Sequence, residues 1–225
     1  MDVDGKLVLL TGGTSGIGRQ LADQLRHKGA LVVVTGRNPK RLADVRKAGF
    51  DAIEADFTTA AGVQKVIDIW GDRPLDILIN NAGMGRTHDF RSEGAPDTAK
   101  VLDDVDQSIF TNVNAPIHLI THFMDRLKAS SAENGKAMIV NVTSGLAITP
   151  SIAATYSATK AALRAYTLAL RVQMKPFGIH VLVGKTHTIF MADTTVNERP
   201  SAEMLAHIAE RTAMVASTEL SATAS

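Results

Sequence analysis

The 225-residue sequence contains no cysteine. Disulfides, thiolate nucleophiles and cysteine-ligated metal sites are therefore excluded, and a reducing compartment fits. Aromatic residues make up only 4% of the chain, which argues against the stacking platforms that bind single-stranded nucleic acid. No apolar run approaches the roughly 18 residues of a membrane-spanning helix, and the acidic start MDVDGK does not resemble a signal peptide. These absences predict a cytoplasmic protein that uses no metal and binds neither nucleic acid nor a membrane.

An excess of charge of either sign is also missing. The 24 basic and 23 acidic residues give a formal net charge of +1, which provides no electrostatic basis for binding nucleic acid or an anionic membrane. The content of 45% hydrophobic and 21% charged residues is ordinary for a globular protein. The length predicts one domain over residues 1–225, with the residues after about 217, in the segment ELSATAS, disordered.

Short β-branched runs alternate with helical patterns along the chain. The predicted strands cover residues 7–12, 31–36, 52–57, 75–80, 138–142 and 179–183. The predicted helices run from Ile17 to Gly29, from Asn38 to Gly49, from Thr58 or Thr59 to Trp70, and over 99–129 and 155–175. This alternation predicts an α/β fold, a single-domain Rossmann-like, doubly wound parallel sheet with helices on both faces. Ligands of such sheets bind beyond the carboxyl ends of the strands.

A glycine-rich turn, TGGTSGIG at residues 11–18, follows the first predicted strand. Its glycines would let the backbone approach a pyrophosphate, and the helix that starts there offers free N–H groups and a partial positive charge. The spacing differs from the standard G-x-G-x-x-G, so an ordinary strand-to-helix turn is the alternative interpretation.

Arg37 follows the second predicted strand, in TGRN. Sites for NAD usually place an acid near this point to take the ribose 2′-hydroxyl, whereas an arginine suits a 2′-phosphate. The residue therefore favours NADP(H) over NAD(H), with a solvated surface arginine as the alternative.

Tyr156 and Lys160 form a Y-x-x-x-K pair, so they share one face of a helix. An ammonium near a phenol favours the phenolate and lowers its pKa, which would make Tyr156 a proton donor and acceptor near neutral pH. Ser144, at a strand end, could hydrogen-bond a substrate carbonyl. Asn112 lies within a predicted helix shortly before Pro116, which predicts a local distortion. Each feature also has an ordinary interpretation. The Tyr156–Lys160 spacing can arise by chance, Ser144 can be a turn residue, and Asn112 can mark a simple helix kink.

The ordered set is similar to the short-chain dehydrogenase/reductase family. The shared features are TGGTSGIG, Asp56, NNAG at 80–83, Asn112, Ser144 and the Tyr156–Lys160 pair. The resemblance runs from about Leu7 to Val183 and implies a dinucleotide site made from several strand ends. The family would assign Gly12, Ser15, Gly16, Ile17 and Gly18 to the phosphates, Arg37 to the 2′-phosphate, Asp56 and Phe57 to the adenine, and Asn81, Ala82 and Gly83 to the adenosine ribose and central part of the cofactor.

The resemblance also implies a catalytic group. Tyr156 would protonate the carbonyl oxygen, and Ser144 would polarise that carbonyl. Lys160 would bind the nicotinamide ribose and lower the pKa of the tyrosine, and Asn112 would support a water that relays protons. Ser144 lies twelve positions before Tyr156, one fewer than is usual. Thr143 has the usual spacing, but the run TSGLA favours Ser144.

The resemblance weakens after Val183. The family normally continues with a Pro-Gly or Pro-Pro turn, a threonine that clamps the nicotinamide, and a lid, but here the next proline is Pro200. One interpretation is an internal deletion that fuses two strands in VLVGKT and shortens the C-terminal region. The other is a divergent lid over residues 188–194.

These features predict an NADP(H)-dependent oxidoreductase that interconverts a small ketone or aldehyde with an alcohol. A non-catalytic NADP(H)-binding sensor or scaffold with the same fold is the alternative. The two long helices resemble those that assemble this family's oligomers, and small residues at Ala158, Ala161 and Ala162 would permit close packing, so we expect a homodimer or homotetramer. The sequence does not specify the substrate, although Met84, Phe90, Leu146, Ile148, Phe190 and Met191 suggest an apolar pocket.

Overall fold

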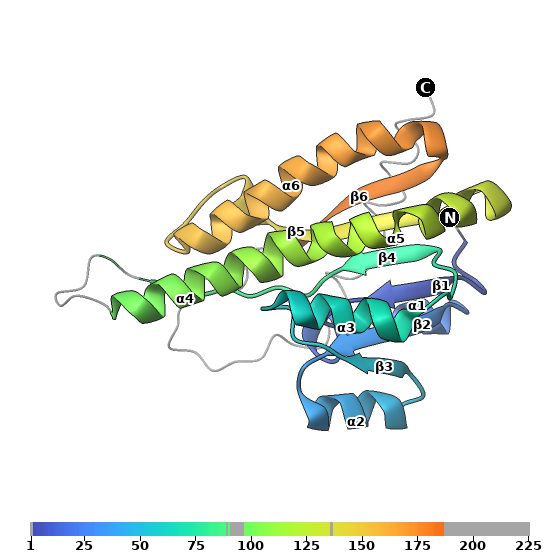
Figure 1. The fold of residues 1–225 in the computed structure, drawn as a ribbon, viewed down its shortest axis with the longest axis horizontal. Helices are drawn as coiled ribbons and strands as arrows, with labels where there is room; N and C mark the ends of the chain where they lie inside the picture. The colour runs from blue at the N-terminus through green and yellow to red at the C-terminus, as the bar shows by residue number, and fades with distance from the viewer. Residues whose placement is uncertain (1, 89, 91–96, 136, 187–225) are drawn as a thin grey trace.

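The computed structural model describes residues 2–88, 90, 97–135 and 137–186, which build one parallel sheet between two layers of helices (Figure 1). The sheet has six strands in the order β3-β2-β1-β4-β5-β6. The strands are β1 (Leu7–Leu10), β2 (Leu31–Gly36), β3 (Asp51–Glu54), β4 (Ile77–Asn80), β5 (Ala137–Ser144) and β6 (Ile179–Thr186). Because β1 pairs with both β2 and β4, the strand order reverses there, and a ligand site is expected at the carboxyl end of β1.

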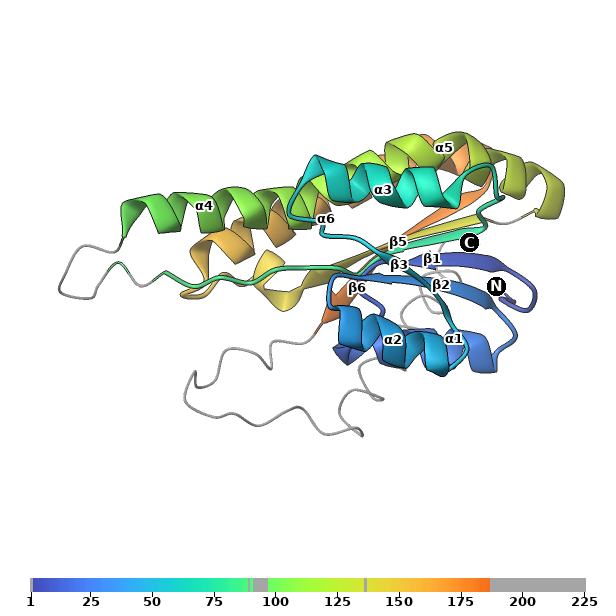
Figure 2. The same ribbon diagram turned by 60° about the horizontal axis from the view of Figure 1, so that its bottom comes forward.

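Six α-helices connect and follow the strands. They are α1 (Gly16–His27), α2 (Pro39–Lys47), α3 (Ala60–Trp70), α4 (Thr98–Ile109), α5 (Ala115–Asn134) and α6 (Ala154–Met174). Figure 2 shows α1 and α2 on one face of the sheet and α3, α5 and α6 on the other. The predicted doubly wound α/β fold is therefore confirmed. Within the described residues, no helix combines the length and apolar character needed to cross a membrane.

Most predicted elements are present with modest shifts at their ends. The strand expected over 7–12 ends at Leu10, and the one expected over 52–57 covers 51–54. In both cases the last predicted residues belong to the loop that lines the ligand cleft, where hydrogen bonds outside the strand ladder replace strand pairing. The last strand extends beyond the predicted 183 to Thr186 and pairs with β5 along its whole length.

The predicted helix over 99–129 is wrong in one respect. The chain forms α4, then a π-helix at Phe110–Asn114, then α5, so the distortion expected near Asn112 is present. Pro116 has no N–H to donate to the carbonyl four residues earlier, that of Asn112. The N–H of Ala115 instead donates to the carbonyl of Phe110, five residues back. The wider turn places Asn112 in the site described below.

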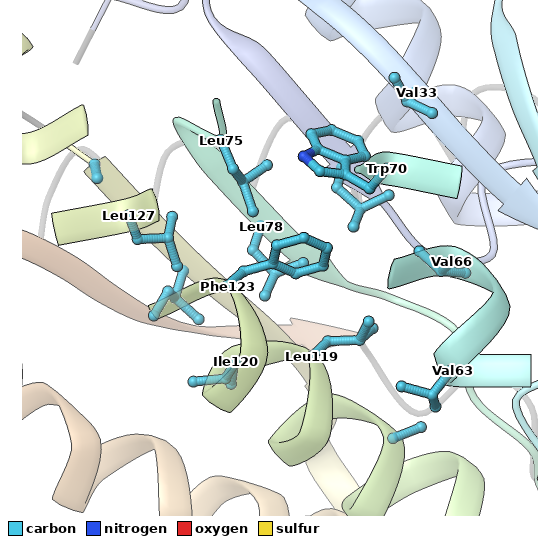
Figure 3. Close-up of a cluster of buried hydrophobic side chains, with 14 of the residues drawn as sticks. Val33, Val63, Val66, Trp70, Leu75, Leu78, Leu119, Ile120, Phe123 and Leu127 are labelled. Carbon is cyan, nitrogen blue, oxygen red and sulfur yellow. The ribbon is translucent and has the colours of Figure 1, made fainter. Parts of the chain in front are cut away.

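The larger core lies between the sheet and the layer that contains α3 and α5. Figure 3 shows Trp70 of α3 and Phe123 of α5 meeting above Leu78 of β4, and their rings meet edge to face at 5.7 Å between centroids. All three side chains are almost fully buried. Burial of this size fixes α3 and α5 on the sheet, and through them the strand ends that carry the site.

Candidate active site

A cleft of about 660 Å³ opens at the carboxyl ends of β1, β2 and β4, where the strand order reverses. It gathers residues that are far apart in the sequence. The cofactor-site residues predicted from the sequence that line it are Gly12, Ser15, Ile17, Gly18, Arg37, Asp56, Phe57, Asn81, Ala82 and Gly83. Gly16 begins α1 between two of these residues without lining the cleft itself.

Two glycines of the turn are required by close backbone contacts. Gly12 has a positive φ of 68°, and a Cβ there would lie 2.9 Å from Cα of Ala82. A Cβ on Gly18 would lie 2.3 Å from the carbonyl oxygen of Gly12, closer than any side chain can tolerate. The turn and the first helical turn of α1 therefore pack backbone against backbone. Ser15 caps α1 without a side-chain hydrogen bond to the helix, so the first N–H groups of the helix point into the cleft region as an anion site requires.

The segment after β4 holds the glycine turn in place. The side chain of Asn81 donates to the carbonyls of Thr11 and Gly12, at 3.0 and 3.3 Å. The hydroxyl of Thr11 accepts from the N–H groups of Asn81 and Ala82, each at 3.0 Å. Asn81 thus supports the glycine turn from below the cleft. Thr11 has the same supporting role, and sequence reasoning missed it because a strand-end threonine carries no signal by itself.

Two arginines line the cleft just after β2. Arg37 is largely exposed and 3.8 Å from Asp56, an exposed pair of little energetic weight. Arg41 also lines the cleft and donates to the hydroxyl of Ser15 at 3.1 Å. Sequence reasoning missed Arg41, although its spacing of four from Arg37, just after the Asn38 cap, places it within one helical turn. The side chain of Phe57 is buried in the core, so this residue presents its backbone to the cleft.

Tyr156 and Lys160, which were also predicted to bind the cofactor, do not line this cleft; they lie against the segment that follows β4. A Cβ on Gly85 would be 3.6 Å from the Tyr156 ring, and one on Gly83 would be 3.2 Å from Nζ of Lys160. Gly83 and Gly85 both line the cleft. Nζ of Lys160 lies 5.7 Å from the centroid of the Tyr156 ring and donates to the carbonyl of Val142 at 2.9 Å. The helical pair predicted from the sequence therefore meets the glycine segment of the cleft.

The environment changes both pKa values. Burial raises the pKa of Tyr156 above its ordinary value of 10.0, and a hydrogen bond with the Ser144 side chain lowers it by less. Burial lowers the pKa of Lys160 from 10.5 to about 8, because the apolar surroundings disfavour its charged form. The lowered tyrosine pKa expected from the Y-x-x-x-K spacing is therefore not what this arrangement produces, since burial outweighs the hydrogen bond with Ser144.

The lowered pKa of Lys160 predicts a rise in stability with pH. Below about pH 8 the ammonium is charged in both folded and unfolded chains, so its burial costs stability. Between about pH 8 and pH 10.5 the unfolded chain still binds a proton that the folded chain has released, so the free energy of unfolding rises with pH. We expect wild type to gain roughly 3 kcal/mol relative to Lys160→Met across this interval, measured by urea unfolding. A difference that stays constant with pH would contradict the lowered pKa.

Both the oxygen and the nitrogen of the Asn112 side chain form hydrogen bonds within the protein. Its Oδ1 accepts from the N–H of Met84 at 2.8 Å, and its Nδ2 donates to the carbonyl of Met84 at 2.8 Å and to the hydroxyl of Thr159 at 2.9 Å. The residue is fully buried. The π-helix therefore fixes the segment after β4 against α6. Both N–H groups of the Asn112 side chain are thus engaged within the protein, and the proton-relaying water expected from the resemblance stays a prediction.

Thr143 and Ser144 differ in which side of β5 their side chains face. Thr143 donates to the carbonyl of Gly184 in β6 at 3.1 Å. The Ser144 side chain accepts from the N–H of Leu146 at 3.2 Å and hydrogen-bonds with Tyr156. Adjacent strand residues point to opposite sides, so only Ser144 faces the tyrosine.

Other predictions meet the structure only in part. Of the residues thought to suggest an apolar pocket, Met84 lines the cleft, Leu146 is buried, and Phe90 and Ile148 are exposed. The run VLVGKT ends β6, so neither interpretation of the region after Val183 is tested, because the lid over 188–194, Phe190, Met191 and the segment after about 217 lie outside the described residues. Among the residues that the structure does describe, no three His, Cys, Asp or Glu side chains gather as a metal site would require.

Comparison with known proteins gives consistent matches. A family model described as short chain dehydrogenase matches residues 6–203. The chain is 32% identical over 205 residues to DltE of Bacillus subtilis, described as an uncharacterized oxidoreductase; the match covers 88% of this chain and 76% of that protein. It is 33% identical over 185 residues to the NADPH-dependent 1-acyldihydroxyacetone phosphate reductase of Schizosaccharomyces pombe, covering 78% of this chain and 57% of that enzyme.

A solved structure of a short-chain dehydrogenase from Sphingobium yanoikuyae in complex with NADPH superimposes with a TM-score of 0.73. It shares 26% sequence identity, and the match covers 95% of this chain and 85% of the other.

Proposed function

Because the chain belongs to the short-chain dehydrogenase family, we propose that it is an NADP(H)-dependent oxidoreductase that interconverts a carbonyl group and an alcohol. The observation that carries the proposal is the position of Tyr156 and Lys160 against Gly83 and Gly85 at one end of the dinucleotide cleft. This proximity supports a site in which a bound cofactor and a proton donor would meet, as hydride transfer requires.

The chain's residues fit a nicotinamide dinucleotide. The Gly12–Gly18 contact has room for backbone alone, so a diphosphate can approach the turn and the start of α1. Arg37 and Arg41 provide positive charge at the adenine end. A bound NADPH supplies the hydride for carbonyl reduction.

Three side chains would handle the substrate. The Tyr156 hydroxyl would donate its proton to the carbonyl oxygen; its raised pKa keeps it protonated and ready to donate at neutral pH. The Ser144 hydroxyl would hydrogen-bond the same oxygen as negative charge develops there. Lys160, held by Val142, would bind the nicotinamide ribose, and its positive charge would stabilise the tyrosinate left after the proton has moved.

The direct test is consumption of NADPH in the presence of simple aldehydes and ketones, followed by absorbance. Turnover that depends on the carbonyl compound supports the proposal. Tight NADPH binding with no turnover on any carbonyl would instead support a non-catalytic NADP(H)-binding sensor or scaffold.

The preference for NADPH predicts a specific effect of Arg37. Charged hydrogen bonds are worth about 1.5–3 kcal/mol, so Arg37→Gln should raise the Kd for NADPH about 10- to 100-fold and leave the Kd for NADH nearly unchanged. Fluorescence titration measures both. Lys40→Gln, an exposed neighbour in α2 that does not line the cleft, is the matched control for lost charge. Equal affinity of wild type for the two cofactors would refute the role of Arg37.

We also propose that the chain forms a homodimer or homotetramer through α4 and α6. Leu102 and Ile109 of α4 and Leu168 and Val172 of α6 are exposed apolar side chains, which a second copy would cover. Light scattering in solution distinguishes an oligomer from the 24.0 kDa monomer, and a monomeric mass would reject the proposal.

A further inference from the structure

A cluster of basic side chains gathers around Asp104 beside the catalytic end of the cleft. Oδ1 of Asp104 is 3.3 Å from Nε of Arg86, and Oδ2 is 3.1 Å from Nε2 of His88 and 3.0 Å from Nζ of Lys100. Asp104 comes from α4, whereas Arg86 and His88 belong to the segment that follows β4, which runs beside α4 (Figures 1 and 2). Neither the dinucleotide site nor the proton-transfer group described above uses this cluster.

The charges of the cluster do not cancel among these side chains. Arg86 and Lys100 carry two positive charges against the single negative charge of Asp104, whatever the protonation of His88. Hydrogen bonds hold the pKa of Asp104 below its ordinary value of 3.8, and the one from His88 contributes more than the one from Lys100. The carboxylate therefore stays ionised at neutral pH and keeps its contacts with the surrounding cations. Asp104 is only 6% exposed, and it therefore positions the surrounding cations rather than serving as a ligand itself.

Arg86 is the member of the cluster that faces the cleft. It lines the cleft together with Gly83, Met84 and Gly85, and its side chain is 48% exposed. It follows directly after Gly85, where a Cβ would lie 3.6 Å from the Tyr156 ring. Its contact with Asp104 uses Nε, so its two terminal nitrogens can pair with a second anion.

We propose that Arg86, held by Asp104, binds an anionic group of the substrate, so that the protein acts on carbonyl compounds that carry a carboxylate or a phosphate. This rests on the proposed oxidoreductase function and adds a substrate class to it. In the proposed function the diphosphate would lie at the glycine turn and the 2′-phosphate at Arg37, whereas Arg86 directly follows Gly85, which lies against the Tyr156 ring. An anion at Arg86 therefore belongs to the molecule that meets Tyr156.

A matched pair of aldehydes tests the proposal. 4-Carboxybenzaldehyde and methyl 4-formylbenzoate present the same aldehyde, with and without a negative charge. We expect wild type to show a higher kcat/KM for the acid. Arg86→Gln should lower kcat/KM for the acid at least about tenfold through KM, as loss of a charged hydrogen bond implies, and change the ester less than about twofold. Arg86→Lys should restore part of the effect, because it keeps the charge without the planar fork.

Controls separate binding of the substrate from other roles. Lys47→Gln, an exposed residue of α2, removes the same charge at a distance and should change neither aldehyde. Circular dichroism should show Arg86→Gln folded as wild type. A rise in the Kd for NADPH in Arg86→Gln would make Arg86 a cofactor ligand, and equal losses for acid and ester would make it structural. Either result overturns the proposal.

A binding measurement distinguishes failure of this inference from failure of the proposed function. Calorimetric titration of 4-(hydroxymethyl)benzoate into the NADPH-saturated protein needs no turnover, because the alcohol and the cofactor are both in the reduced state and cannot react. We expect its Kd to rise at least about tenfold in Arg86→Gln. Turnover of the ester with no preference for the acid and no such binding overturns the anion site while leaving the oxidoreductase standing. Binding that depends on Arg86 with no turnover of either aldehyde supports the anion site and rejects the catalytic proposal.

Discussion

Tyr156→Phe should lower kcat about 10³-fold while NADPH still binds with nearly unchanged affinity. The phenol provides the proton for the carbonyl oxygen, and a positioned general acid is worth about 10²–10⁴-fold. The substitution removes one oxygen from a ring that packs against Gly85, so the shape of the cleft is conserved. Turnover is measured with NADPH and an aldehyde, and binding by fluorescence titration.

Tyr166→Phe is the matched control for this prediction. Tyr166 is the second of the chain's two tyrosines, also lies on α6, and packs against the larger core. Its substitution should leave turnover within about twofold of wild type, because a conservative substitution of a half-buried side chain usually has a small effect. Unchanged turnover in Tyr156→Phe would show that the phenol is not the proton donor. The observed reaction would then come from another residue or from a contaminating enzyme.

Gly18→Ala should raise the Kd for NADPH more than about 100-fold and destabilise the fold by roughly 1–3 kcal/mol. The added methyl would lie 2.3 Å from the carbonyl oxygen of Gly12 and 2.4 Å from Nδ2 of Asn81. One of these contacts is backbone and the other holds the glycine turn, so neither can yield cheaply. Relief requires α1 to move away from the turn, which displaces the helix N-terminus from the diphosphate position.

Gly135→Ala serves as the control for an added methyl group. Gly135 ends α5 with a φ of 74°, and no atom lies within 4 Å of a Cβ there. This variant should lose only about 1 kcal/mol of stability, because alanine is disfavoured at a positive φ. It should bind NADPH as wild type does. Titrations by fluorescence and unfolding in urea report the two effects separately. Wild-type NADPH affinity in Gly18→Ala would mean that the diphosphate does not rest on this turn.

The sequence is sufficient for the fold because its signals are local. The apolar run LVVVTG predicts β2 with its exact ends, and Asn38 with Pro39 marks the start of α2, where Asn38 accepts from the N–H of Arg41. The cleft residues were predicted for the same reason, since glycine turns and strand ends follow chain order. Their catalytic and binding roles stay predictions until tested by the experiments above.

The features that the sequence did not predict depend on contacts between distant residues. Asp104 lies in an ordinary helical pattern, and only folding brings it to Arg86 and His88. The side chain of Asn112 pairs with Met84 because the π-helix turns it there. The pKa of Tyr156 was predicted in the wrong direction because spacing reveals the neighbouring lysine but not the depth of burial.

The double hydrogen bond between Asn112 and the backbone of Met84 has an evolutionary consequence. It anchors the chain just before the residues that would meet the substrate, so the proton-transfer centre is insulated from changes farther along. Changes to the chain beyond this anchor need not shift Gly83 or Gly85. An anchor of this kind would let related proteins acquire new substrates while they keep the same proton-transfer centre.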